Sequence, residues 1–247
     1  MPLTYAIGDV HGRRDLLEAL LSAIRTDAAG RDARIIFLGD LIDRGPESRQ
    51  CLDLAIAVLE EFPGSRLILG NHEEFLLEFI ESPESRETVA SRWLANGGLT
   101  TLRSYSLSDR LRIDTLAERF ARDYPAHVEA LRQADWMAET DTHVFVHGGI
   151  DPALPLGEQD PKTTRWIRSK FLDHPGPLPK IVVHGHTVTE SFLPELHNNR
   201  IAIDTGAVRS GHLTCAIFHG DAPPRFLATD DHGRTIEVTE VRPLDCR

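Results

Sequence analysis

Short apolar runs alternate with amphipathic segments along the first 80 residues. The runs that predict buried strands are 3–7, 34–38 and 66–69, and a glycine follows each of them. Residues 15–24 place leucine and isoleucine on one helical face, and Pro46 suits the first turn of a second helix. A third helix is predicted at 73–80. This order of strands and helices predicts a largely buried sheet flanked by helices.

A different pattern covers residues 82–140. This segment is charged, helix-prone and rich in arginine, and we expect a helical insertion packed over the sheet. Strand patterns return after residue 142, with turns rich in proline and glycine between them. The later strands are predicted at 143–146, 180–183, 200–203, 213–218, 225–228 and 235–241. The sequence thus predicts one α/β domain over residues 1–247 that carries a helical insertion.

Polar clusters rich in glycine follow five of the predicted strands. Their sequences are GDVHG at 8–12, GDLIDRG at 39–45, GNHEE at 70–74, HGG at 147–149 and HGHT at 184–187. In open α/β sheets, ligands bind just beyond the carboxyl ends of strands, so these clusters are expected to converge on one crevice. The metal-binding side chains that they bring are Asp9, His11, Asp40, Asn71, His147 and His186.

This mixture of carboxylate, imidazole and amide oxygen has a chemical meaning. It suits Mn, Fe, Zn or Co, and it suits neither calcium nor metals that select thiolates. Asp9 and His11 are two residues apart at a strand end, so they point to the same side. A carboxylate such as Asp40 can bridge two ions ~3.5–4 Å apart, which would activate a water and clamp the oxygens of a phosphoryl group. The pattern predicts a dinuclear centre.

Three neighbouring polar residues fit phosphoester hydrolysis. His72, beside Asn71, could protonate the leaving alkoxide, and Asp43 could hold its imidazole in the required tautomer. Arg44 could grip the oxygens of a phosphate in a bidentate fork.

The overall charge limits the partners of the chain. The 247 residues carry 27 Lys+Arg and 38 Asp+Glu, a formal net charge of −11. Nucleic acid and membrane surfaces are negative and would repel such a protein, so neither is expected as a partner. Phosphate chemistry remains open, because bound metal ions reverse the local field.

The cysteines and the N-terminal segment predict a cytoplasmic protein. Cys51, Cys215 and Cys246 form no CxxC pair and no disulfide framework, which fits a reducing compartment. No signal-peptide pattern begins the sequence, and no apolar stretch approaches the ~18 residues of a membrane helix. The motifs for a P-loop and a Rossmann site are also absent from the sequence.

Together the five clusters resemble those of the phosphoprotein phosphatase branch of the calcineurin-like metallophosphoesterases, above all the small bacterial and phage serine/threonine protein phosphatases. Further likeness lies in GNHEEFLL at 70–77, Trp93 with NGG at 96–98, WIR at 166–168 and IDTGAV at 203–208. The resemblance spans residues 4–214 and is weaker over 99–140.

The resemblance implies a four-layer α/β/β/α sandwich, two divalent ions and manganese for activity. One ion would be held by Asp9, His11 and Asp40, and the other by Asp40, Asn71, His147 and His186. His72 would be the general acid and Asp43 its orienting carboxylate. Arg44, Arg168 and Asn71 would contact the phosphate.

The predicted function is hydrolysis of phosphoserine and phosphothreonine in proteins, by attack of a metal-bridging hydroxide without a phosphoenzyme. The alternative is a small-molecule phosphohydrolase, such as a diadenosine tetraphosphate hydrolase. Related enzymes of that class usually show GNHD and lack the full DRG, whereas this chain has Glu73 and the tripeptide 43–45. A third hypothesis is an inactive module that captures phosphorylated partners. The intact His72 and Asp43 argue against it, because a binding module needs no acid for a leaving group.

Several other residues receive structural interpretations. Glu73, Glu74 and Glu78 open a helix, where carboxylates favour the positive end of its dipole. Trp93 and Trp136 are interpreted as core residues, and the arginines at 86–122 as a solvated helix face. His184 has two interpretations, a supporting role beside His186 or ordinary packing in a strand.

Overall fold

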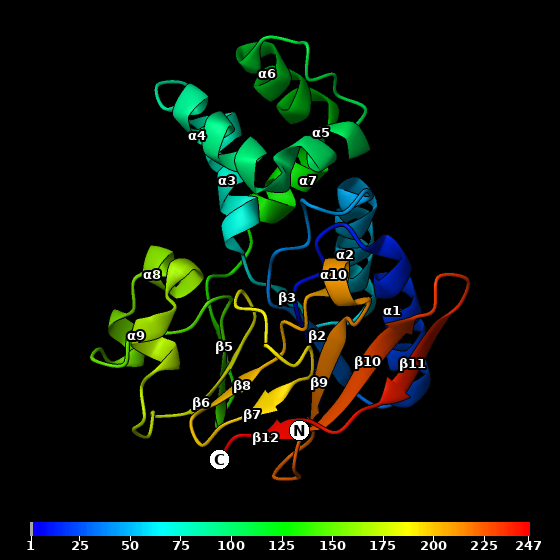
Figure 1. Ribbon diagram of the computed structural model, residues 1–247, viewed down its shortest axis with the longest axis vertical. Coiled ribbons are helices and arrows are strands. Elements are labelled where there is room, and N and C mark those ends of the chain that lie inside the picture. The colour runs from blue at the N-terminus through cyan, green and yellow to red at the C-terminus, as the bar shows by residue number, and fades with distance from the viewer. Residues whose placement is uncertain (1) are drawn as a thin grey trace.

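Two six-stranded sheets form the centre of the protein, described here by a computed structural model that covers residues 2–247 (Figure 1). The first sheet has the order β11-β10-β9-β1-β2-β3 and comprises β1 (Leu3–Ile7), β2 (Ala33–Phe37), β3 (Arg66–Leu67), β9 (Thr214–Phe218), β10 (Arg225–Asp231) and β11 (Ile236–Glu240). The second has the order β12-β7-β8-β6-β5-β4 and comprises β4 (Ala138–Glu139), β5 (His143–Phe145), β6 (Ile181–His184), β7 (Glu195–Leu196), β8 (Arg200–Ala202) and β12 (Leu244–Asp245).

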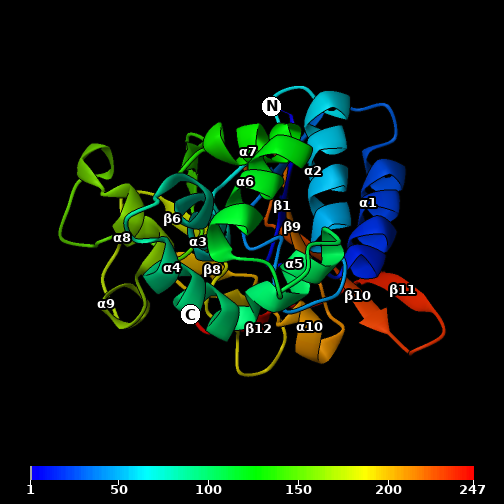
Figure 2. The same cartoon turned by 90° about the horizontal axis from the view of Figure 1, so that it is seen from above.

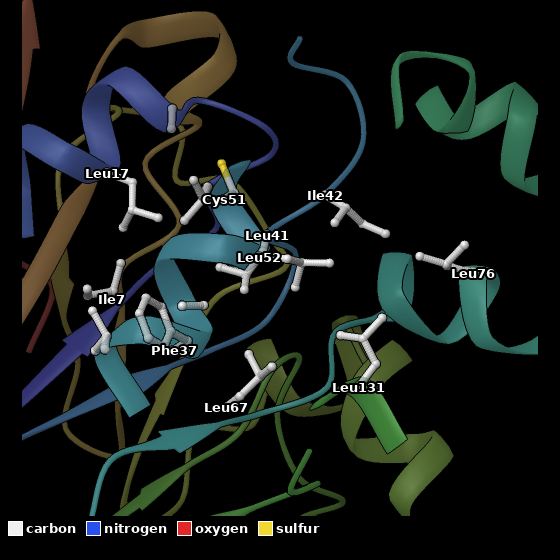
Figure 3. Close-up of a cluster of buried hydrophobic side chains, with 14 of the residues drawn as sticks. Ile7, Leu17, Phe37, Leu41, Ile42, Cys51, Leu52, Leu67, Leu76 and Leu131 are labelled. Carbon is white, nitrogen blue, oxygen red and sulfur yellow. The ribbon is translucent and has the colours of Figure 1, made fainter. Parts of the chain in front are cut away.

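Alternation along the strands divides the core into layers. In β1, Tyr5 faces the helices beside the first sheet, whereas Ala6 belongs to the apolar cluster between the two sheets. In β5, Phe145 enters the same inter-sheet cluster, and Val144 faces the opposite side. Figure 3 shows the helix-side cluster, in which Phe37 lies among side chains from α1, α2 and α7.

Helices complete the sandwich on both outer faces. Helices α1 (Arg14–Ala28) and α2 (Ser48–Glu61) cover the first sheet, and α8 (Pro161–Trp166) and α9 (Ser169–Leu172) lie beside the second (Figure 1). The predicted four-layer α/β/β/α architecture is confirmed. A short helix, α10 (Ala207–Ser210), follows β8. None of the described helices has both the length and the hydropathy that a membrane crossing requires.

The segment predicted as an insertion is helical and packs on other helices. It contains α4 (Arg86–Trp93), a π-helical turn (Leu94–Gly98), α5 (Leu99–Ser104), α6 (Ile113–Asp123) and α7 (Pro125–Arg132). These helices contact mainly α2 and α3 (Asn71–Glu81). They stand above one end of the sheets in Figure 1, and in the view from above they lie in front of the strands (Figure 2), so they cover strand ends and not a sheet face.

Local boundaries differ from the sequence pattern in two places. Helix α2 begins at Ser48, so Pro46 precedes the helix and does not form its first turn; the Ser48 hydroxyl accepts a hydrogen bond from the backbone N–H of Asp43 (3.0 Å). Strand β3 ends at Leu67; Ile68 still donates its N–H to the carbonyl of Phe37 in β2 (2.9 Å), and it also bridges to Asp135 in the chain that returns from α7. Strands β4, β7 and β12 are two residues each and have no recognisable sequence pattern.

Candidate active site

Parallel strands bring the polar clusters to one edge of the sandwich. Strands β1, β2 and β3 are parallel in the first sheet, and β5, β6 and β8 are parallel in the second. The loops after these strands contain most of the left-handed backbone outside glycine. The residues with positive φ are His11 (47°), Asp40 (52°), Asp43 (70°), Arg44 (67°) and His186 (64°). Such conformations are costly for residues with a side chain and gather at functional sites.

Asp40 lies at the centre of these loops. Its Oδ1 is 3.3 Å from Nε2 of His147, and its Oδ2 is 3.6 Å from Nε2 of His11 and 3.9 Å from Nε2 of His72. Burial alone would raise the pKa of Asp40, but the surrounding histidines, above all His147, hold that pKa well below its usual value. Asp40 thus lies between His147 on one side and His11 and His72 on the other, and its role as a bridging ligand stays a prediction.

On one side of Asp40, several ligand atoms share a single proton or have no hydrogen-bond partner. The Nδ1 of His147 donates to the carbonyl of Leu38 (2.8 Å), and its Nε2 lies 2.9 Å from Oδ1 of Asn71. Burial lowers the pKa of His147, but the Asp40 carboxylate outweighs burial and raises that pKa to about 10. His147 therefore also carries a proton on Nε2, next to the Asn71 oxygen. The nearby Nε2 of His186 is buried without a hydrogen-bond partner within residues 2–247, and burial lowers the pKa of His186 to about 2.

These four side chains match the chemistry of a cation site. Ligand atoms of Asp40, His147 and His186 lie within 4.8 Å of one another, and the Asn71 oxygen adjoins them. A proton satisfies only one pair of these atoms, whereas a divalent ion accepts electron pairs from all of them. The residues present thus fit the second of the two predicted metal sites.

On the other side of Asp40, the polar side chains form hydrogen bonds with one another and with the backbone. His11 donates from Nδ1 to the carbonyl of Ile42 (2.8 Å), which leaves Nε2 as a ligand atom. Arg44 donates to Nε2 of His11 (2.6 Å) and to Nε2 of His72 (3.0 Å). Atoms of His11, Asp40 and His72 form a second group within 4.8 Å, and burial lowers the pKa of His11 to about 3. His11 is therefore neutral at pH 7, as a metal ligand must be.

Asp9 takes a position that the predicted ligand set does not describe. Its carboxylate accepts the backbone N–H of His186 (3.1 and 3.2 Å), so it ties the loop after β1 to the loop after β6. Burial and the neighbouring carboxylate of Asp204 raise the pKa of Asp9. Asp204 is buried beside it and accepts the N–H of Gly206 (3.0 Å). The role of Asp9 as a ligand stays a prediction.

His72 and Asp43 form a closed pair. The Nδ1 of His72 donates to Oδ2 of Asp43 at 2.6 Å, and both side chains are buried. Burial alone would lower the pKa of His72, but the carboxylates of Asp40 and Asp43 outweigh it and raise that pKa. The pair has the geometry of a general acid with its orienting carboxylate, as the sequence predicts.

The helical insertion fixes this pair, a role that sequence reasoning missed. Trp93 donates from Nε1 to both oxygens of Asp43 (3.0 and 2.9 Å), and the Thr101 hydroxyl donates to Oδ1 (2.5 Å). Gly98 makes this approach possible, because a Cβ at that position would lie 2.5 Å from the indole ring. The chain kinks just before it, at Gly97 (φ 109°). Trp93 is a core residue as interpreted, but a buried indole N–H also needs an acceptor.

Glu73 also does more than favour the helix dipole. It lies in the first turn of α3, which begins at Asn71, and its carboxylate points inward. It accepts the backbone N–H groups of Asp40 (2.8 Å), Leu41 (2.7 Å), Ile42 (3.2 Å) and Gly70 (3.1 Å). Glu73 therefore holds the left-handed loop that carries Asp40 and Asp43.

Two arginines stand at the rim. Arg44 and Arg168 are both exposed, and Nη1 of Arg168 is 3.5 Å from the Thr187 hydroxyl. Upstream of Arg168, Trp166 donates to Glu74 (2.5 Å) and Arg165 donates to the same carboxylate, which fixes the segment that leads to the rim. Both guanidinium groups reach solvent, so each can donate hydrogen bonds to the oxygens of an anion, Arg44 by giving up its imidazole contacts.

His184 belongs to a different face. It follows the alternation of β6 away from the crevice and packs edge-to-face on Phe171, with ring centroids 5.1 Å apart. Its Nδ1 donates to the carbonyl of Gly185 (3.0 Å) and not to a side chain of the site. The structure thus favours strand packing for His184.

Comparison with known proteins adds three findings. A family model for calcineurin-like phosphoesterases matches residues 3–204. A symmetrical bis(5'-nucleosyl)-tetraphosphatase from Chromohalobacter salexigens is 42% identical over 244 residues, which cover 98% of this chain and 73% of that protein. Serine/threonine-protein phosphatase 1 from Salmonella typhimurium is 28% identical over 224 residues, 86% of this chain and 90% of that protein.

Among solved structures, one of a candidate diadenosine tetraphosphatase has a TM-score of 0.61 and 20% identity. The match covers 98% of this chain and 96% of the other. At this identity the likeness shows the fold.

Proposed function

The chain belongs to the calcineurin-like phosphoesterase family, and we propose that within this family of hydrolases it removes phosphate from phosphoserine and phosphothreonine in proteins. Its partners would be phosphorylated proteins or peptides.

The observation that carries this proposal is the His72–Asp43 pair. The alkoxide that leaves a phosphoserine is a strong base, so its departure requires a proton from a positioned acid. A nucleotide leaving from a dinucleoside tetraphosphate is a weak base and needs little such help. The 2.6 Å bond of His72 to a buried carboxylate, held in turn by Trp93, supports a substrate of the first kind.

Two divalent ions would be held on either side of Asp40. His11 and Asp40, with Asp9 after a rotation of its carboxylate, would hold the first. Asp40, Asn71, His147 and His186 would hold the second. Bound there, the ions supply a water activated near neutral pH and positive charge beside the phosphate. Oxygen and nitrogen ligands suit manganese, and equally Fe, Zn or Co.

The protein side chains would perform the remaining tasks. Arg44 is exposed and can exchange its two imidazole contacts for phosphate oxygens, and Arg168 would bind them from the opposite rim. His72 would give the proton on Nε2 to the leaving oxygen while Asp43 keeps the proton on Nδ1.

The 42% identity to a tetraphosphatase favours a second candidate, hydrolysis of a dinucleoside tetraphosphate. The two functions are separated by kcat/KM for a phosphoserine peptide, a phosphotyrosine peptide and diadenosine tetraphosphate, each with Mn²⁺. We expect the phosphoserine peptide to be the best substrate. A higher value for diadenosine tetraphosphate would replace the first proposal with the second.

His72→Asn tests the acid directly. It should lower kcat on the phosphoserine peptide by at least ~10²-fold, with little effect on the tetraphosphate, since only the first leaving group needs the proton. Metal content should stay that of the wild type. An unchanged kcat on the phosphopeptide would remove His72 from the reaction.

A further inference from the structure

A second group of metal-binding side chains lies on the edge of the second sheet. Glu195 belongs to β7, His197 follows it, and Cys246 follows β12. The two strands are parallel, with Leu244 opposite Glu195 and Asp245 opposite Leu196. Alternation therefore puts the side chains of Glu195, His197 and Cys246 on one face of neighbouring strands.

Their ligand atoms already converge. One atom each of Glu195, His197 and Cys246 lies within 4.8 Å of the others, and Nε2 of His197 is 3.0 Å from Oε2 of Glu195. Glu195 and His197 are half-buried, whereas Cys246 is exposed and can be reached from solvent. The group shares no residue with the active site.

We propose that Glu195, His197 and Cys246 bind a zinc ion that fastens β12 to β7. A carboxylate, an imidazole and a thiolate are all ordinary zinc ligands, and water can complete the tetrahedron. The thiolate disfavours magnesium and manganese, so this site would differ in metal preference from the Asp40 centre. On binding, the thiol proton passes to solvent.

The surrounding charge is compatible with such an ion. The negative ligands are Glu195 and the Cys246 thiolate, and Arg200 is the cation that acts on both. Asp245 is a third negative charge that acts on Cys246; Arg200 offsets one of the three, and zinc brings the group to zero. A half-buried group of that charge next to solvent is well tolerated.

A metal would also explain how so short a strand stays in place. The backbone bonds that join β12 to its neighbour include Leu244 N–H to Pro194 O and Cys246 N–H to Leu196 O, both 2.8 Å. A two-residue strand is marginal without further support. Leu244 and Glu195 line a cavity of about 630 Å³ together with Thr187, which follows His186, so the zinc would close one wall behind the active-site loop.

Titration of the full chain with Co²⁺ tests the site, because a cobalt–thiolate bond gives a charge-transfer band in the near ultraviolet. Oxygen and nitrogen ligands at the Asp40 centre give no such band. We expect the band in the wild type and in Asp40→Asn, and we expect it to disappear in Cys246→Ser. Cys51→Ala, which removes a thiol from α2, is the matched control and should keep the band.

No band in the wild type, or a band that persists in Cys246→Ser, would overturn the site. Zinc should also slow hydrogen exchange at the amides of Leu244 and Cys246 in the wild type, and Cys246→Ser should lose this protection. Equal exchange with and without zinc would contradict the fastening role. Neither readout depends on phosphatase activity.

Discussion

The two sides of Asp40 are built on opposite principles. On the His72 side, the named polar groups have hydrogen-bond partners from the protein. The Asp43 carboxylate accepts hydrogen bonds from His72, Trp93 and Thr101. Arg44 donates to the imidazoles of His11 and His72. On the His147 side, one proton on Nε2 of His147 is shared between the oxygens of Asn71 and Asp40, and Nε2 of His186 is buried with no partner among the described residues. Buried polar atoms left in this way are costly unless a ligand completes them.

The two sides differ in what the protein itself completes. On the His72 side the insertion supplies partners for the proposed acid, and the first proposed ion would lie there at His11 and Asp40. On the His147 side the second proposed ion would complete a buried atom that the described residues leave without a partner. Asp40 joins the two.

The largest effect is expected where both sides meet. Asp40→Asn removes the shared charge, and metal activation is worth several kcal/mol, so activity should fall by about 10³-fold. The loss should be equal for p-nitrophenyl phosphate and a phosphoserine peptide, with a parallel loss of bound metal. Asp221→Asn, in an exposed turn, is the matched control. Retained activity would contradict the central position of Asp40.

The pH dependence of metal affinity reports on His147 separately from His72. The Asp40 carboxylate overcomes burial and raises the pKa of His147 to about 10, so a proton competes with metal below that pH. Apparent affinity should therefore rise by about tenfold per unit between pH 6 and 8, with release of one proton. The same proton stabilises the metal-free fold most fully below the unfolded pKa of ~6.5, and this contribution disappears as pH rises toward 10.

Calorimetric titration with Mn²⁺ in buffers of different ionisation enthalpy measures that proton. His72→Asn should keep the same slope, since His72 belongs to the other side. An affinity that does not change with pH would contradict the assignment of His147.

A smaller loss of activity is expected when the contact between the insertion and Asp43 is weakened. Trp93→Phe removes a hydrogen bond to a charged carboxylate, worth about 1.5 kcal/mol, so kcat on a phosphoserine peptide should fall by about tenfold. The rate on p-nitrophenyl phosphate, whose leaving group needs little proton transfer, should change far less. Trp136→Phe makes the same change elsewhere in the segment and should affect neither. Equal losses on both substrates would mean that Trp93 acts only through stability.

The strand ends could be predicted because their chemistry is local. Asp40 and His147 each follow an apolar run and adjoin glycine, so their sequence neighbours already place them at a strand end. The support of Asp43 could not be read in this way, since Trp93 lies 50 residues further on and its pattern fits a core residue equally well. Glu73 was assigned to the helix dipole because the pattern does not show that the residue points at a loop 33 residues upstream.

The shortest strands could not be predicted for a related reason. Strands β7 and β12 are too short to display a period of two, and their pairing is fixed by the fold around them. The predicted end of β3 is too late because the apolar run continues to Leu69, whereas the residue pairs between β2 and β3 end at Leu67.

The position of Gly97 has a consequence for motion. A Cβ there would lie 2.8 Å from the backbone nitrogen of Arg44, and that nitrogen donates to the Gly97 carbonyl (3.3 Å). A shift of the insertion is therefore transmitted to Arg44 and, through Trp93, to Asp43. His147 and His186 follow strands β5 and β6 of the second sheet and make no such contact with Gly97 or Trp93. A shift of the insertion would thus reach Arg44 and Asp43 directly, whereas it would reach His147 and His186 only through Asp40 and Asn71, which adjoin both sets.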